Sequence, residues 1–149
     1  MVKKVLHIVD SLRSGGAETI AVNSYNYLNR ESGVESYLCA TRLEGALKAN
    51  LTKLDNYLFL NKKSSLDKSA LKKLFSYIKK HEIEIIHAHT TSFFIAVLVK
   101  FRYPGVKIFW HNHTGANVNL SGWRKWFLKI NSLFFHTIIN VNEDLNEWS

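Results

Sequence analysis

Two pairs of histidines could do chemistry in this sequence, because each pair occupies alternate positions in a short apolar run. His87 and His89 are two residues apart, as are His111 and His113, so each pair points to one face of a strand. Imidazoles can bind zinc, but no Cys, Asp or Glu stands with them, and a structural zinc site is normally closed by four ligands. We therefore expect no metal. We expect His87 and His111 to be packed and hydrogen-bonded, and His89 and His113 to reach a ligand cleft.

A glycine-containing loop between the first apolar run and the first helical segment could bind an anion. It reads SLRSGGAE over residues 11–18. Gly15 and Gly16 let the backbone approach a ligand closely, and free N–H groups at a helix start favour negative charge. The loop lacks the third glycine of the dinucleotide fingerprint and the Lys-Ser/Thr of a P-loop. The alternative is a tight turn only, and we expect Gly16 to need a positive φ.

Six short runs rich in Val, Ile, Leu, Phe or Tyr alternate with segments of helical periodicity. They cover residues 5–10, 35–41, 57–60, 84–89, 107–113 and 137–142. This alternation predicts an α/β fold with a parallel sheet covered by helices. Local signals agree, since Ser-Ser-Leu-Asp at 64–67 predicts a helix start, and Pro104 with Gly105 ends an element before the strand near 107.

The residues that end each strand are candidate ligand contacts, because ligands of an open parallel sheet bind beyond the carboxyl ends of its strands. We predict that Asp10, Gly16, His89 and His113 gather at this edge. The strand-end residues are Asp10, Ser11, His89, Thr90, His113, Thr114 and Asn142.

The composition is that of one globular domain. The chain has 149 residues, 46% of them hydrophobic and 21% charged, which excludes disorder as its main description. Its single cysteine, Cys39, cannot form an internal disulfide, so a reducing, cytoplasmic location is the simpler interpretation. The apolar run 5–9 is too short for a signal peptide, and the uncharged stretch 85–99 is shorter than the roughly 20 apolar residues of a spanning helix.

The net charge of +8 attracts phosphates of nucleic acid, anionic lipid or a nucleotide. Much of it lies around one predicted helix, and no aromatic residues interleave with it as single-strand binding requires. We therefore interpret these lysines as a solvated helix face and expect no nucleic-acid partner. The lysines are Lys62, Lys63, Lys68, Lys72, Lys73, Lys79 and Lys80.

A second basic segment, residues 121–135, carries an apolar helical stripe with basic flanks. The stripe favours a helix that faces the core, while the flanks leave a peripheral membrane contact open. The stripe consists of Trp123, Trp126, Phe127, Ile130 and Phe134, and the flanks of Arg124, Lys125 and Lys129.

Four segments together carry a family resemblance. They read KVLHIVDSLRSGGAET, EIIHAHTT, KIFWHNHTG and TIINVNEDLNEW, and in this order they span essentially the whole chain. The chain resembles the N-terminal domain of family 4 glycosyltransferases, particularly the bacterial capsule and exopolysaccharide enzymes. The resemblance implies a Rossmann-like parallel sheet of about six strands with helices on both faces, the N-terminal half of a GT-B fold. In that fold the first domain binds mainly the acceptor, and the second mainly the nucleotide-sugar donor.

The resemblance also implies the reaction. Such enzymes transfer a hexose-type sugar, with retention, from a nucleotide-sugar co-substrate to a glycan or lipid-linked acceptor in surface polysaccharide synthesis, without a metal in this domain. Their donor-binding glutamates, spaced E-x7-E, belong to the second domain, and no two glutamates here are eight residues apart. Residues 1–149 are thus expected to be a truncated domain without transferase activity of its own, in the cytoplasm or at the inner face of the membrane.

Carried over by position, Gly15 and Gly16 match the loop that faces the donor's phosphates and sugar, and the strand-end histidines match the acceptor side of the cleft. We take His113 first and His111 next as catalytic candidates, and the sequence leaves open which is the family's cleft histidine. A non-catalytic nucleotide- or phosphate-binding regulatory module is the alternative. The remaining expected cleft contacts are Asp10, Ser11, His89, Thr90, Thr114 and Asn142, the last replacing a Ser that is common in the family.

Overall fold

The computed structural model describes residues 2–113 and 122–140. Its centre is a six-stranded sheet in the order β3-β2-β1-β4-β5-β6, in which all neighbouring strands are parallel. The order reverses between β1 and β4, as in Rossmann-type sheets. All six predicted strands and the predicted parallel sheet are therefore confirmed. The strands are β1 (Lys3–Ser11), β2 (Val34–Leu43), β3 (Tyr57–Phe59), β4 (Ile85–His89), β5 (Lys107–Asn112) and β6 (Thr137–Asn140).

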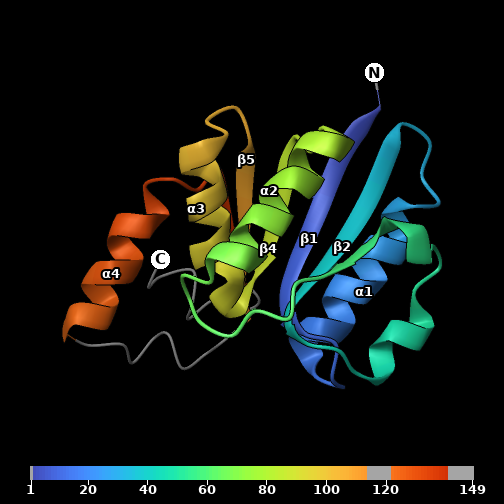
Figure 1. The fold of residues 1–149 in the computed structure, drawn as a ribbon, viewed down its shortest axis with the longest axis horizontal. Helices are drawn as coiled ribbons and strands as arrows, with labels where there is room; N and C mark the ends of the chain where they lie inside the picture. Colours follow the sequence, from blue (N-terminus) through green and yellow to red (C-terminus); the bar gives the residue numbers. More distant parts are fainter. Residues whose placement is uncertain (1, 114–121, 141–149) are drawn as a thin grey trace.

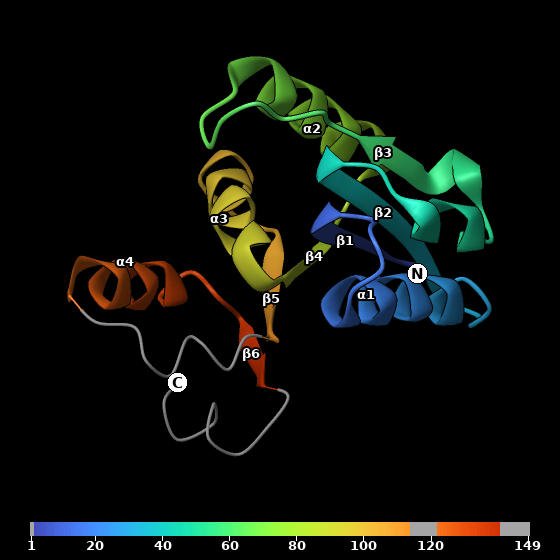
Figure 2. The ribbon, with the colours of Figure 1, turned by 90° about the horizontal axis from the view of Figure 1, so that it is seen from below.

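Helices cover both faces of the sheet, as expected. Helix α1 lies against one face, and α2 and α3 lie against the other (Figures 1 and 2). Short 3-10 turns complete several connections. The α-helices are α1 (Gly16–Leu28), α2 (Lys68–His81), α3 (Phe93–Arg102) and α4 (Gly122–Ser132), and the 3-10 turns are η1 (Ala46–Asn50), η2 (Leu54–Asn56) and η3 (Thr90–Ser92).

The two faces of the sheet have different chemistry because side chains alternate along each strand. On the face covered by α2 and α3, β1 contributes Leu6 and Ile8 to an apolar cluster that also contains Trp110 of β5. Val9 of β1 packs on the α1 side. His7 lies between Ile8 and Leu6 in the sequence, so it points to the α1 side as well. The histidines of β4 and β5 share that face, as the strand register shows.

Helix α2 begins where the sequence predicted. Asp67 is its N-cap, and its carboxylate accepts a hydrogen bond from the backbone N–H of Ala70 at 3.0 Å, the usual capping contact. One lysine departs from the predicted solvated helix face. Lys62 precedes α2 and is only 8% exposed, with its N–H donating to the carbonyl of Thr41 at 2.7 Å. Burial lowers the pKa of its ammonium, and Asp10 opposes this effect.

Helix α4 does not place its whole apolar stripe on the core. Leu128 is buried, and Phe134 packs against the main core cluster. Trp123 and Trp126 are 72% and 66% exposed, which corrects the expectation of a single core-facing stripe. The 100° step of a helix makes the stripe wider than the contact with the core. None of the helices within residues 2–113 and 122–140 has the length and apolar character needed to span a bilayer.

Candidate functional site

Asp10 connects three segments at the carboxyl edge of the sheet. One carboxylate oxygen accepts a hydrogen bond from the Thr41 hydroxyl of β2 at 2.6 Å, and the other accepts from the Thr91 hydroxyl, in the turn after β4. Both oxygens therefore have partners within the protein. Asp10, predicted as a cleft residue, lies at the expected edge and holds the ends of β1, β2 and β4 together.

The turn after β4 is held just as closely. Ser92 is buried, and its hydroxyl lies 2.6 Å from the carbonyl oxygens of both Ile8 and His89, while it accepts the N–H of His89 at 3.0 Å. Thr90, a predicted cleft residue, has φ 50°, a strained value for a β-branched side chain. The indole N–H of buried Trp110 donates a hydrogen bond to the carbonyl oxygen of Thr90 at 2.8 Å. Sequence reasoning missed Ser92 and Trp110, because the first follows a predicted strand and the second lies within one, and neither position by itself signals a role at the site.

The glycine loop has a different backbone from the one expected. Gly15 is the extended N-cap of α1, with φ −157°. Gly16 begins the helix and has no positive φ, since the glycines with positive φ in the described residues are Gly33 and Gly122. The expected strain at Gly16 is therefore wrong. A Cβ at Gly16 would meet no atom within 4 Å, so what Gly16 provides is open space beside the edge of the sheet.

The start of α1 already holds a negative charge. Ser11, a predicted cleft residue, donates its hydroxyl to Oε1 of Glu18 at 3.3 Å. The same carboxylate lies where a Cβ on Gly15 would project. Because α1's N-terminus favours an anion, Glu18 occupies the position that the sequence suggested for a phosphate.

A third glycine, Gly45, which sequence reasoning missed, packs closely against the backbone of the glycine loop. Leu12 donates its N–H to the carbonyl of Leu43 at 3.1 Å, and its own carbonyl accepts from Leu47 at 3.0 Å. Gly45 lies so close to this contact that a Cβ there would overlap the backbone of Leu12 and Arg13. The loop after β2 thus determines where the loop after β1 lies.

Five histidines, not four, gather on the α1 face of the sheet. His7 of β1 pairs in register with His87, and His89 pairs with His111. The rings of His87 and His89 are 4.2 Å apart, and those of His111 and His113 are 3.9 Å apart. Sequence reasoning missed His7 because it lies in the middle of an apolar run rather than at its end.

The expected roles of the histidines are only partly correct. His89 is fully buried and does not reach a cleft. Its Nδ1 lies 3.1 Å from Nε2 of His113. His87 and His111 are partly exposed, and each has a buried ring nitrogen without a hydrogen-bond partner, so the expected hydrogen-bonded packing is wrong for these atoms. His113 is partly exposed at the end of β5 and can contact a ligand.

Burial keeps these imidazoles uncharged at neutral pH. It lowers the pKa values of His87 and His111 to about 4, and the neighbouring imidazoles contribute in the same direction. Burial also lowers the pKa values of His7, His89 and His113. Neutral rings can exchange hydrogen bonds with sugar hydroxyls but give no positive charge to a diphosphate. Two overlapping trios bring one ligand atom per residue within 4.8 Å of one another, namely His7 with His87 and His89, and His89 with His111 and His113.

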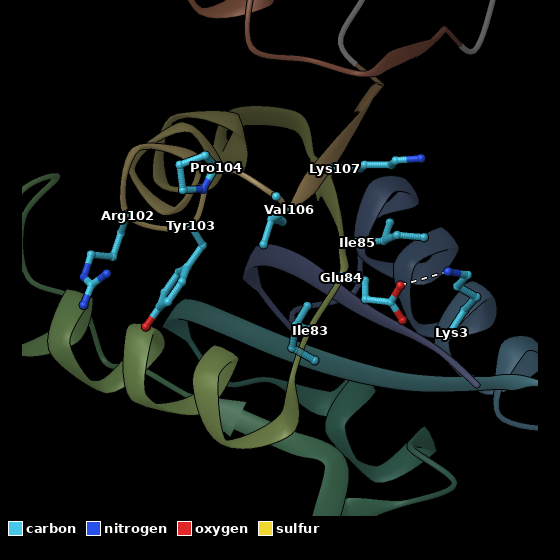
Figure 3. Close-up of a pocket in the computed structure, with 10 residues that line it drawn as sticks. Lys3, Ile83, Glu84, Ile85, Arg102, Tyr103, Pro104, Val106 and Lys107 are labelled. Atoms are coloured by element: carbon cyan, nitrogen blue, oxygen red, sulfur yellow. Dashed lines mark hydrogen bonds and ion pairs between the residues drawn. The ribbon is translucent and has the colours of Figure 1, made fainter. Parts of the chain in front are cut away.

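A cavity of about 510 Å³ lies at the opposite, amino edge of the sheet. Figure 3 shows it between Lys3, at the start of β1, and the segment from Arg102 to Lys107, with the ion pair of Lys3 and Glu84 beside it. It is remote in the fold from the strand ends that carry Asp10 and His113, and we do not assign the site to it. Thr114 and Asn142, both predicted cleft residues, lie outside the described residues.

Replacing Gly45 with Ala should displace the glycine loop, because the new Cβ overlaps the backbone of Leu12 and Arg13. We expect the free energy of unfolding, measured by urea denaturation, to fall by about 1–3 kcal/mol. Gly105→Ala is the matched control, since a Cβ there meets no atom within 4 Å. Equal stability of the two variants would contradict the close approach at Gly45.

Stability should decrease as the pH falls below about 6.5, the usual pKa of histidine in the unfolded chain. The folded-state pKa values of the histidines are lowered, to about 4 for His87 and His111, so the unfolded chain binds more protons in this window. Urea denaturation between pH 7.5 and 5, in the presence of a chelator, measures the slope. His87→Gln with His111→Gln should flatten it, whereas His136→Gln, at an exposed position, should not. A flat profile for the unaltered chain would refute the neutral cluster.

The fold is shared with a known nucleotide-sugar enzyme. The structure is similar to that of UDP-GlcNAc 2-epimerase from Neisseria meningitidis bound to UDP-GlcNAc, with a TM-score of 0.59 and 15% sequence identity. The similarity covers 89% of this chain but 39% of the epimerase chain, and at this identity it supports the Rossmann-like fold alone.

Sequence comparison supplies the family. No curated protein matches the chain closely enough to count as a relative. The family model of Glycosyltransferase Family 4 matches residues 14–147, a range that includes Gly15, Gly16 and the strand-end histidines of β4 and β5. The chain therefore belongs to glycosyltransferase family 4.

Proposed function

We propose that the chain is the N-terminal, acceptor-side domain of a retaining hexosyltransferase of surface polysaccharide synthesis. The nucleotide-sugar donor and a glycan or lipid-linked acceptor would meet at the carboxyl edge of the sheet. The observation that supports this best is the convergence of open Gly16, Asp10 and partly exposed His113 beside the reversal of strand order, in a member of a glycosyltransferase family. The bound UDP-GlcNAc of the epimerase is consistent with a nucleotide sugar.

The chemistry of the edge suggests how the two substrates divide it. The neutral imidazole of His113 suits a sugar hydroxyl, which both donates and accepts hydrogen bonds. The start of α1 suits the donor phosphates, and Glu18 must turn away when they bind, because two negative charges at one helix end repel each other. Backbone N–H groups and the exposed Arg13 would stabilise the departing diphosphate.

The transferase would need a second domain. The chain spans 39% of the length of the epimerase that it resembles, and an E-x7-E pair is not present in it. We expect residues 1–149 alone to transfer no sugar and to bind the donor weakly. The coding sequence after Ser149 distinguishes the proposals, because a second βα domain with E-x7-E supports the transferase, and its absence supports the regulatory module.

His113→Ala in the transferase should lower turnover by about 10- to 100-fold, the loss of one hydrogen bond that forms in the transition state, with a smaller change in substrate binding. The measurements are turnover per folded molecule and thermal stability on one preparation. His136→Ala, at an exposed position far along the chain, is the control. If the His113→Ala protein is less stable but keeps its turnover, His113 has a packing role and no role in catalysis.

Gly16→Val tests the approach of the donor without testing the fold. The side chain projects into open space and the backbone has no positive φ, so the free energy of unfolding should change little. Donor binding, measured by calorimetry, should weaken by at least ~10-fold if phosphate or sugar occupies that space. The donor affinity of Gly16→Ala should lie between those of the unaltered protein and Gly16→Val. Unchanged donor affinity in Gly16→Val would remove this loop from the donor site.

Helix α4 is the best candidate for a peripheral membrane contact, at the inner face of the membrane in a cytoplasmic enzyme. Trp123 and Trp126 of α4 and the following Leu133 are exposed, as is Phe101 of α3. Exposed aromatic side chains on a helix that also carries the exposed Lys129 suit a lipid interface. The double variant Trp123→Ser with Trp126→Ser should release the chain from vesicles that contain anionic lipid, measured by sedimentation. Tyr27→Ser, exposed on α1, is the control. Equal binding of all three proteins would exclude this surface.

A further inference from the structure

The histidine face contains ring nitrogens that no protein group satisfies. Both nitrogens of His7, Nε2 of His87 and Nε2 of His89 are buried without a hydrogen-bond partner among the described residues. His7 and His89 are 0% exposed. Burying a polar atom without a partner costs about 1–3 kcal/mol, and here four such atoms lie in one small region. Each neutral imidazole carries one lone pair and one N–H, so the three rings offer three lone pairs, and a single metal ion can accept one from each.

The strands hold the three rings in a defined geometry. His7 and His87 are register partners on adjacent strands, and His89 follows His87 by two residues on the same face. The ring centroid of His7 lies 5.0 Å from that of His87 and 5.9 Å from that of His89. One potential ligand atom from each residue lies within 4.8 Å of the other two. Small side-chain rotations would bring these atoms to the separations found around a single metal ion.

One of the two tautomers of His89 favours this trio. Its Nδ1 is 3.1 Å from Nε2 of His113. When Nδ1 donates its proton to His113, Nε2 carries the lone pair and can bind a metal ion. A second ring N–H that donates to another group is the usual arrangement of a metal-bound histidine.

We propose that His7, His87 and His89 bind one late first-row transition-metal ion, of which Zn²⁺ is the representative. Three imidazoles and an open fourth position make a tetrahedral site. Imidazole suits zinc, nickel and copper, whereas Ca²⁺ and Mg²⁺ require oxygen ligands, which the trio lacks. The expectation of no metal, drawn from sequence spacing, did not include His7.

The fourth position can be reached from solvent. A cavity of about 400 Å³ borders His7 and His87, and residues of α1 form its other wall. Because the three ligands are neutral, the ion keeps its charge and would take water or an anion from this cavity. The wall residues are Asn23, Ser24, Tyr27 and Leu28.

The other trio, His89 with His111 and His113, is the competing site. It would use only His89 of the first trio, so His7 and His87 would keep buried ring nitrogens without a hydrogen-bond partner among the described residues. We therefore assign the ion to the trio on β1 and β4. The proposal does not depend on sugar transfer, since an ion at this position would cross-link β1 to β4 in any function.

The test uses the chain without a polyhistidine tag, stripped with a chelator and titrated with ZnCl₂. Calorimetry should give one ion per chain, and the melting temperature should rise with free zinc as mass action requires. His87→Gln, at a partly exposed position that is expected to fold, should weaken zinc binding by at least ~10-fold. His81→Gln on α2, which packs on the opposite face, is the matched control and should bind as the unaltered chain does.

Further measurements distinguish the trios and the kind of ion. Co²⁺ in place of Zn²⁺ should give the intense visible absorption of a tetrahedral site. The His111→Gln variant should keep this absorption, whereas the His87→Gln variant should lose it. Ca²⁺ and Mg²⁺ should not compete. The proposal is overturned if zinc does not stabilise the chain, if His87→Gln binds zinc as well as the unaltered chain, or if His111→Gln abolishes binding that His87→Gln retains.

Discussion

The hydrogen bonds between the carboxyl end of β1 and the turn after β4 hold together the edge of the sheet that carries the candidate site. They lie where the strand order reverses. The buried hydroxyl of Ser92 contacts the carbonyl of Ile8, and the carboxylate of Asp10 accepts from Thr91. Both contacts join segments that are more than 80 residues apart in the sequence. They fix Asp10 and the turn that follows His89 relative to each other.

Desolvation determines the chemical character of the site more strongly than the net charge of the chain. The chain carries a formal charge of +8, yet the histidines at the carboxyl edge are kept neutral because the sheet, α1 and one another exclude water from them. The anion that α1's N-terminus favours is a carboxylate of the chain itself, Glu18. The edge is therefore suited to hydrogen bonding with neutral hydroxyls, and phosphate binding must displace a group already present.

The edge of the sheet at which the candidate site residues lie could be predicted from the sequence, but their detailed contacts could not. Asp10, His89 and His113 lie at one edge because parallel strands all end on the same side, which follows from the alternation of strand and helix. The burial of His89, the ordinary backbone of Gly16 and the exposure of Trp123 were predicted incorrectly. Each depends on which neighbouring element packs against the residue, and a single strand or loop does not contain that information.

The six strands, the parallel sheet, a helix start within residues 64–67 and the family could be predicted from the sequence alone, because these depend on local periodicity, on hydrogen-bonding side chains near in sequence and on ordered motifs. Only the folded structure shows that His7 lies beside the other histidines, that Gly45 packs against the glycine loop and that Lys62 is buried. These contacts connect β1, β2 and β4, which are distant in the chain. Their physical cause is strand register, which brings particular residues side by side only after the sheet has formed.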